Sequence, residues 1–271
     1  MQTRAFASTG VQVPVIGQGT WRLGREGAAG LRLGLELGMT HIDTAEMYGD
    51  GEAESVVAGV IHGQREKVFL VSKVLPSNAS YKGTLRACDA SLKRLGTDYL
   101  DVYLLHWWGS HPIADTMRAM EELVRAGKIR AIGVSNLDIA ELKQAQAALT
   151  RERIVCNQVL YHVRSRGIEY RLIDYCREQG IAVVGYTPFG KVNFPDDELG
   201  VIGRRHGKTA RQVALNFLTR RDDVFAIPKA SNLDHVRENA GASGWTLTDE
   251  DLAAIDKLFP PPRREEPLDT A

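Results

Sequence analysis

Residues 31–45 read LRLGLELGMTHIDTA, and the order of residue types in this stretch decides the fold. A helical segment ends at Gly38, and a short apolar run with polar residues behind it follows. A glycine just past the last helical turn is the expected left-handed C-cap, and the apolar run suits a strand covered on both faces. The same pattern returns in residues 119–136 (AMEELVRAGKIRAIGVSN) and 172–188 (LIDYCREQGIAVVGYTP), so each stretch predicts a helix-to-strand junction.

Five further segments are strand candidates, which brings the number of predicted strands to eight. They are residues 15–21, 67–74, 99–106, 154–161 and 224–230. Most are separated by about 30 residues, the length of one βα unit, and no linker rich in proline or serine divides the chain. Eight such units in 271 residues predict an α/β fold, one closed (β/α)8 TIM barrel that spans residues 1–271 as a single domain. The alternative is an open doubly wound sheet. It would require Gly-x-Gly-x-x-Gly after the first strand, and neither GQGTWRLG nor GREGAAG has that spacing.

The composition excludes several classes of protein. The 34 basic and 34 acidic residues give no net charge, which argues against nucleic acid or a membrane surface as the main partner. No run of about 18 apolar residues is present, and the start, MQTRAFASTG, lacks the apolar core of a signal peptide, so we expect a cytoplasmic protein. Cys88, Cys156 and Cys176 lack CxxC spacing and are predicted to be reduced thiols in the core.

Ionisable side chains stand at the ends of three successive predicted strands. Asp43 and Tyr48 follow the second strand, Lys73 ends the third and His106 ends the fourth. Enzymes with this barrel build their sites at the C-terminal ends of the strands, so these four side chains should meet. A nearby Lys73 ammonium would favour the phenolate of Tyr48 and lower its pKa toward neutrality.

Asp43 and His106 have separate roles in this hypothesis. A buried ammonium is costly, and the carboxylate of Asp43 would offset much of the desolvation of Lys73. An N–H of His106 would orient a carbonyl and stabilise the oxyanion that forms when it is attacked.

The motifs around these residues resemble those of the aldo-keto reductase family. GMTHIDTAEMYGDGEAE, VSKV, YLLHW, GVSN, NQVLYH, VVGYTPFG and IPKASNLDHVREN occur in the family's order between Gly17 and Asn239. The resemblance implies a catalytic tetrad at Asp43, Tyr48, Lys73 and His106, with Tyr48 as the general acid when a nicotinamide hydride reduces a carbonyl. It also implies a short N-terminal β-hairpin, about residues 3–15, that closes the bottom of the barrel.

The resemblance also implies a cofactor, NADPH or NADP+, with NADH possible. Ser135, Asn136 and Gln158 would hydrogen-bond the nicotinamide carboxamide, and Tyr186 would stack on the ring. An alternative for Asn136 is a helix N-cap before residues 137–145. Thr187 to Gly190 would lie along the pyrophosphate. Lys229, Glu238 and Asn239 would contact the 2′-phosphate and the adenine. The remaining cofactor positions that the motifs imply are Gly19, Thr20, Trp21, Phe189, Ala230, Ser231, Asn232 and His235.

Two positions depart from the family's phosphate motif. Ala230 stands where the family usually has serine, and His235 stands where it usually has arginine. The phosphate would then contact Lys229, Asn232 and His235 without a bidentate partner, so the preference for NADPH over NADH should be weakened. Arg237 lies about 200° around the helix from His235 and should face away.

Apolar residues at the same rim are predicted to line the substrate pocket. These are Trp21, Met47, Leu75 and Trp107. The loop after His106 is short, and the tail FPPPRREEPLDTA is too small for a long C-terminal lid. An open aromatic mouth suits small aldehydes and dicarbonyls such as methylglyoxal, or aromatic aldehydes, and the motifs are most similar to bacterial members that reduce such compounds. The tail carries no dimerisation signal, so we expect a monomer.

Three other classes of protein fit the sequence less well. A metal-dependent barrel hydrolase would need a third ligand beside His41 and Asp43, and none is secure, so no metal is predicted. A Schiff-base aldolase built on Lys73 would leave the nicotinamide motifs unexplained. A regulatory barrel that senses NADP(H) with little turnover is the remaining alternative, and the intact tetrad argues against it.

Overall fold

The computed structural model describes residues 1–270; residue 271 lies outside the described residues. Eight parallel strands form one sheet in which strands that follow one another along the chain are hydrogen-bonded neighbours, from β3 to β10. Their bounds are β3 (Gln18–Gly19), β4 (His41–Asp43), β5 (Phe69–Val74), β6 (Leu100–Leu105), β7 (Ile129–Ser135), β8 (Ile154–Leu160), β9 (Ala182–Tyr186) and β10 (Val224–Ala226).

The first and last strands of this sheet meet and close it into a barrel. The backbone N–H of Ala226 donates to the carbonyl of Val15 at 3.0 Å, and the N–H of Gly17 donates back to the carbonyl of Ala226 at 2.8 Å. One step further along, the N–H of Gly19 donates to the carbonyl of Pro228 at 3.0 Å. The predicted (β/α)8 barrel is therefore confirmed, and no doubly wound sheet forms.

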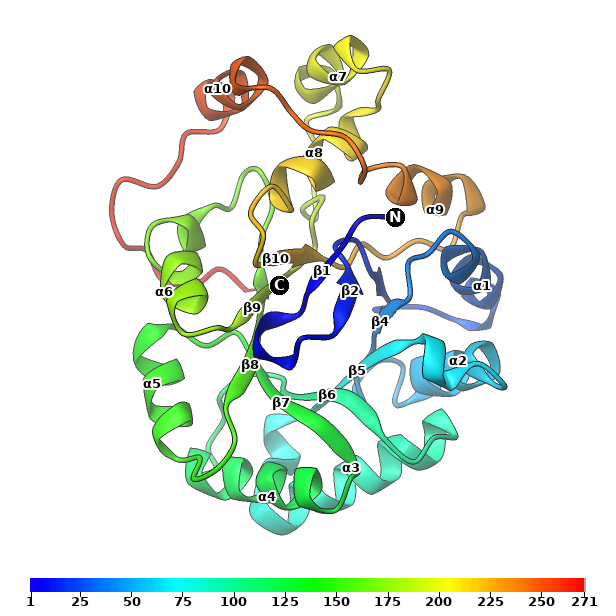
Figure 1. The fold of residues 1–271 in the computed structure, drawn as a ribbon, viewed down its shortest axis with the longest axis vertical. Coiled ribbons are helices and arrows are strands. Elements are labelled where there is room, and N and C mark those ends of the chain that lie inside the picture. Colours follow the sequence, from blue (N-terminus) through cyan, green and yellow to red (C-terminus); the bar gives the residue numbers. More distant parts are fainter. Residues whose placement is uncertain (271) are drawn as a thin grey trace.

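Helices surround the strands (Figure 1). One helix follows each strand from β3 to β8, two follow β9, one follows β10, and a further helix lies near the end of the chain. Their bounds are α1 (Ala28–Glu36), α2 (Glu52–Ile61), α3 (Tyr81–Leu95), α4 (Ile113–Arg125), α5 (Ile139–Ala147), α6 (Leu172–Glu178), α7 (Asp196–Arg205), α8 (Ala210–Leu218), α9 (Leu233–Ala240) and α10 (Asp249–Leu258). Within residues 1–270, none of the helices has both the length and the apolar character needed to cross a membrane.

The glycines of the three predicted junctions have left-handed backbones. Gly38, Gly127 and Gly180 have φ angles of 87°, 72° and 67°, which side chains with a Cβ rarely adopt. Each glycine lets the chain leave a helix and enter the next strand, as predicted. The three cysteines are buried and unpaired, which confirms the prediction of core thiols.

A hairpin covers the bottom of the barrel. Strands β1 (Thr3–Ala5) and β2 (Gln12–Pro14) pair antiparallel, and Figure 1 shows them in front of the barrel strands. Phe6, just after β1, is fully buried, with its ring centroid 4.8 Å from that of Phe69 and 5.0 Å from that of Phe225. The hairpin that the resemblance implied is therefore present, although strand periodicity alone had not predicted it.

His41 is buried in this aromatic plug. Its ring centroid lies 6.1 Å from that of Phe6 and 5.5 Å from that of Phe69, and neither ring nitrogen has a hydrogen-bond partner among residues 1–270. Burial, followed by the charge of Lys73, lowers the pKa of His41 to about 3. The folded chain therefore keeps a neutral imidazole at pH values where the unfolded chain would take up a proton.

This histidine makes stability depend on pH. The folded pKa is depressed, so its full contribution is present above the unfolded pKa of 6.5 and is lost as pH falls toward about 3. The free energy of unfolding of wild type should fall as the pH is lowered from 6.5 to 5. In His41→Leu we expect this fall to be smaller by about 2 kcal/mol, measured by urea unfolding at both pH values. The exposed His62 provides the control, because His62→Leu should leave the pH dependence unchanged. An unaltered slope in His41→Leu would contradict this account.

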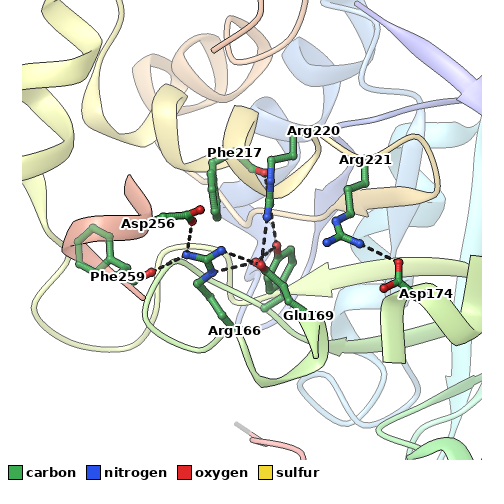
Figure 2. A network of polar contacts seen from close by, with 9 residues as sticks. Arg166, Glu169, Asp174, Phe217, Arg220, Arg221, Asp256 and Phe259 are labelled. Carbon is green, nitrogen blue, oxygen red and sulfur yellow. Dashed lines mark hydrogen bonds and ion pairs between the residues drawn. The ribbon is translucent and has the colours of Figure 1, made fainter. Parts of the chain in front are cut away.

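A buried ionic network ties the loop after β8 to helices α8 and α10 (Figure 2). The guanidinium of Arg166 donates to Glu169 Oε2 at 2.7 Å, to Asp256 Oδ1 at 2.8 Å and to the carbonyl of Phe259 at 2.5 Å. Arg220 donates to the same Glu169 oxygen at 3.1 Å. One carboxylate thus joins two guanidiniums from distant parts of the chain.

Candidate active site

Lys73 lies at the centre of a group of buried polar side chains at the C-terminal ends of β4 and β5. Its Nζ donates to Asp43 Oδ1 at 2.6 Å, to the carbonyl of Thr44 at 2.8 Å and to Tyr48 Oη at 3.1 Å. Three oxygen acceptors match the three N–H groups of an ammonium, so we assign Lys73 as charged. The Thr44 carbonyl is a partner that the sequence had not indicated.

Strand register brings Lys73 and Asp43 together. Asp43 pairs with Val71 in the neighbouring strand, and Lys73 is two residues further along. Residues two apart in a strand point to the same face, so Lys73 and Val71 share the face that looks into the barrel. Tyr48 reaches the same point from the loop after β4.

Burial and charge set the protonation of the group. Burial lowers the pKa of Lys73, but Asp43 and Tyr48 outweigh it and raise the pKa overall. Burial raises the pKa of Asp43, against the opposing effects of Lys73 and Gln158. Burial also raises the pKa of Tyr48, and Lys73 lowers it only in part. The predicted net lowering for Tyr48 is therefore wrong, because desolvation of the phenolate is the larger effect. The phenol stays protonated at neutral pH.

His106 lies beside the phenol. Its ring centroid is 5.8 Å from that of Tyr48, and its buried Nδ1 has no partner among residues 1–270. Burial and then the charge of Lys73 lower the pKa of His106 to about 3, so the imidazole is neutral. A neutral ring carries one N–H, which suits a hydrogen bond to a carbonyl rather than a charge contact.

A chain of hydrogen bonds extends from Asp43 to the ends of β7, β8 and β9. Gln158 Nε2 donates to Asp43 Oδ2 at 2.7 Å, and Ser135 Oγ donates to the carbonyl of Gln158 at 2.8 Å. Asn136 Nδ2 donates to Ser135 Oγ at 3.1 Å, and Tyr186 Oη donates to Asn136 Oδ1 at 2.8 Å. All four predicted nicotinamide residues therefore lie in one connected group next to the tetrad.

The backbone at this group is unusual in two places. Asn136 and Thr187 have φ angles of 59° and 53°, a region that non-glycine residues seldom adopt. The alternative that Asn136 caps the next helix is excluded. The N-cap of α5 is Asp138, whose side chain accepts from the N–H of Glu141 at 2.8 Å. The side chain of Asn136 therefore does not cap α5 and faces the other polar groups of the site.

The residues predicted for the adenosine end form the loop before α9 and the helix itself. Lys229 and His235 are exposed, and the hydroxyl of Ser231 is buried without a hydrogen-bond partner in the described part of the chain. Asn232 Oδ1 accepts from the N–H of Asp234 at 2.7 Å and so caps α9. The rest of the implied cofactor positions lie at the end of β3, in the loops after β9 and β10, or on α9: Gly19, Thr20, Phe189, Gly190, Ala230, Glu238 and Asn239.

Arg237 is engaged elsewhere on α9. Its Nη1 donates to Asp234 Oδ1 at 3.2 Å, so the guanidinium already has an anionic partner on its own helix. That Arg237 does not replace the missing arginine at His235 stays a prediction.

Aromatic side chains flank the phenol at the rim. Trp21 is 47% exposed, with its ring edge-on to Tyr48 at 5.1 Å between centroids. Trp107 is 39% exposed, and its ring centroid is 4.9 Å from that of His106. Met47 packs against the cluster that contains Tyr48. Both tryptophans are therefore partly exposed to solvent and contact rings of the tetrad.

The fourth predicted pocket residue, Leu75, lies just past β5 and is held through its backbone. Its N–H donates to Glu46 Oε1 at 2.7 Å. Trp108, the residue after Trp107, packs against the main hydrophobic core, whereas Trp107 is partly exposed.

Glu54 supports the site and was missed from the sequence. It is fully buried, and its carboxylate accepts from Ser72 Oγ at 2.6 Å and from Arg94 Nε at 2.6 Å. Ser72 precedes Lys73, so Glu54 fixes the strand that carries the ammonium. The sequence could have predicted the burial of Glu54, because Glu54 shares a helix face with the apolar Val57 and Ile61 at positions i+3 and i+7.

The model of the aldo/keto reductase family matches residues 15–259. The chain belongs to the aldo/keto reductase family. The match confirms the resemblance drawn from the motifs.

Relatives of this aldo/keto reductase are similar over nearly the whole chain. Methylglyoxal reductase YeaE of Escherichia coli (strain K12) is 44% identical, with 99% of each chain covered. Glyoxal reductase of Bacillus subtilis (strain 168) is 36% identical, with 92% of this chain and 90% of that protein covered. An aldo/keto reductase from Klebsiella pneumoniae, solved in complex with NADP and acetate, has a TM-score of 0.95 and 43% identity, with 100% of both chains covered.

Proposed function

We propose that this aldo/keto reductase reduces small aldehydes and ketones to alcohols with NADPH. The observation that carries the proposal is the hydrogen bond of the Lys73 ammonium to Tyr48 Oη at 3.1 Å, next to the ring of His106. Because Tyr48 Oη accepts from Lys73, its own O–H remains available for a substrate oxygen. A protonated phenol, a charged lysine and a neutral imidazole together suit proton donation to a carbonyl.

The residues present fit a nicotinamide dinucleotide phosphate. The buried hydroxyl of Ser231 has no hydrogen-bond partner within residues 1–270, so it can donate to a phosphate oxygen. At the other end, Tyr186 and Asn136 offer an aromatic ring and an amide at the tetrad. Ser135, Asn136 and Gln158 would hold the carboxamide, and Thr187 to Gly190 would lie along the pyrophosphate. The solved structure of the Klebsiella pneumoniae relative contains NADP.

Each side chain of the tetrad has a distinct part in the reaction. NADPH, when bound, supplies the hydride that forms the new C–H bond at the carbonyl carbon. Tyr48 donates its phenolic proton to the carbonyl oxygen, and Lys73 stabilises the phenolate left behind. Asp43 keeps Lys73 charged and in place. His106 donates an N–H to the carbonyl oxygen and orients it toward Tyr48.

The substrate class follows from the open aromatic rim. Trp21 and Trp107 are both partly exposed and flank Tyr48 and His106, so a small carbonyl compound can reach the phenol directly. We propose methylglyoxal and similar dicarbonyls, or aromatic aldehydes, as substrates. Two relatives carry the names methylglyoxal reductase and glyoxal reductase.

The test is a titration of the purified protein with NADPH and with NADH, followed by tryptophan fluorescence. Methylglyoxal or a nitrobenzaldehyde is then added while the absorbance of the reduced nicotinamide is recorded. We expect tighter binding of NADPH and oxidation that depends on the aldehyde. Binding without oxidation of any aldehyde would instead indicate a nucleotide-sensing barrel, and binding of neither nucleotide would refute the proposed cofactor.

The phosphate site gives a separate prediction. If the charge missing at position 235 weakens recognition of the 2′-phosphate, His235→Arg should tighten NADPH by roughly tenfold and NADH much less, through a bidentate contact. Dissociation constants for both nucleotides measure this directly. Equal effects on the two nucleotides would show that His235 does not face the 2′-phosphate.

A further inference from the structure

Arg211 in the first turn of α8 is a cation held against two aromatic rings. The centre of its guanidinium lies 4.6 Å from the ring centroid of Phe189 and 5.1 Å from that of Phe194. The two rings are edge-on to each other, with centroids 5.5 Å apart. Stacking fixes the plane of the guanidinium and leaves its edge N–H groups for other partners.

The guanidinium of Arg211 has no anionic partner among the described residues. Within residues 1–270, Arg211 forms no ion pair and no hydrogen bond, whereas Arg166, Arg220 and Arg221 each have a carboxylate partner. Arg211 is also only half exposed, so water does not fully solvate it. A positioned, half-buried guanidinium with five free donors is suited to a planar anion such as phosphate.

The position of Arg211 connects it with both parts of the proposed nucleotide site. Phe189 belongs to residues 187–190, which we propose lie along the pyrophosphate. The next residue on α8, Gln212, donates from Nε2 to the carbonyl of Glu238 at 3.0 Å, and Glu238 is on the segment proposed to contact the adenine. The first turn of α8 therefore contacts both segments.

We propose that Arg211 is a phosphate anchor for the dinucleotide. It would supply from α8 a guanidinium of the kind absent at His235 on α9. This inference rests on the proposed function, since it assumes that a nicotinamide dinucleotide binds here. Its chemistry is recognition of phosphate, which is present both in the pyrophosphate and in the 2′-phosphate of NADPH.

Direct binding measurements test the anchor without relying on turnover. Dissociation constants of NADPH and NADH are measured by tryptophan fluorescence for wild type, Arg211→Gln and the control Arg204→Gln. Arg204 is an exposed arginine of the neighbouring helix α7, so its variant removes the same charge without touching the rings. We expect NADPH to bind Arg211→Gln about tenfold more weakly, as for loss of one hydrogen-bonded charge, and Arg204→Gln to resemble wild type.

Two readouts separate a phosphate contact from a purely structural role. A weaker affinity for both nucleotides places Arg211 at the pyrophosphate, and a loss for NADPH alone places it at the 2′-phosphate. In either case, affinity should fall less steeply with added salt in Arg211→Gln than in wild type, because one screened charge contact is gone. An unchanged salt dependence, or a loss no greater than in Arg204→Gln, overturns the proposal. Failure of wild type to bind either nucleotide overturns the proposed function as well.

Discussion

Replacing Tyr48 with phenylalanine is expected to lower the turnover of aldehydes by about 10²-fold or more, because the variant lacks the proton donor. The phenyl ring still fills the space beneath Trp21, so the affinity for NADPH should change little. Turnover is measured as aldehyde-dependent oxidation of NADPH, and affinity is measured by fluorescence titration. The separation of the two effects is what identifies a chemical rather than a packing role.

Tyr103 on β6 offers a matched control for the same chemical change. Its side chain is fully buried, and its hydroxyl has no hydrogen-bond partner among the described residues. Tyr103→Phe should keep wild-type turnover, since the lost hydroxyl makes no hydrogen bond to any of residues 1–270. If Tyr48→Phe also retained turnover, Tyr48 would not be the proton donor.

Replacing Glu169 with glutamine is expected to reduce the free energy of unfolding by about 3–5 kcal/mol. Glutamine keeps the shape but leaves the guanidiniums of Arg166 and Arg220 without the carboxylate between them (Figure 2). Both guanidiniums also stack on the ring of Phe217, at 4.9 Å and 3.8 Å. The side chain of Arg166 is only 4% exposed, so water cannot replace the lost partner. Urea unfolding at neutral pH measures the change.

The pair of Arg221 and Asp174 in the same view is the control (Figure 2). Its N–O distance of 3.0 Å is similar, but the two side chains are 30% and 43% exposed. Asp174→Asn should therefore cost no more than about 1 kcal/mol. If Glu169→Gln lowers the free energy of unfolding no more than Asp174→Asn does, the buried network stabilises the fold no more than a surface ion pair.

The position of the tetrad could be predicted largely from local sequence patterns. Glycine after a helical run marked each junction, and apolar runs marked the strands. Once eight strands were counted, the barrel placed Asp43, Lys73 and His106 at one end, because parallel strands present their C-terminal ends together. The roles of these residues came from the family motifs, since a strand-end lysine or histidine has no specific chemistry by itself.

The protonation of the site was decided by packing. The sequence placed a lysine near Tyr48 and so predicted a lowered pKa, but burial of the phenol raises it. Glu54 was likewise overlooked, because its helix pattern does not name Ser72 and Arg94 as its partners.

The order of strands, the three junction glycines and the identity of the strand-end residues were determined by the sequence itself, because they depend on local periodicity and backbone preference. Other features depended on the tertiary structure, because they arise between residues distant in the chain. Gln158 donates to Asp43 from 115 positions away, and the pKa of His41 is lowered only inside the aromatic plug. The rings of Phe189 and Phe194 likewise meet Arg211 only after α8 packs against the loop that follows β9. Burial sets the energy of each of these contacts, and burial exists only once the whole barrel has closed.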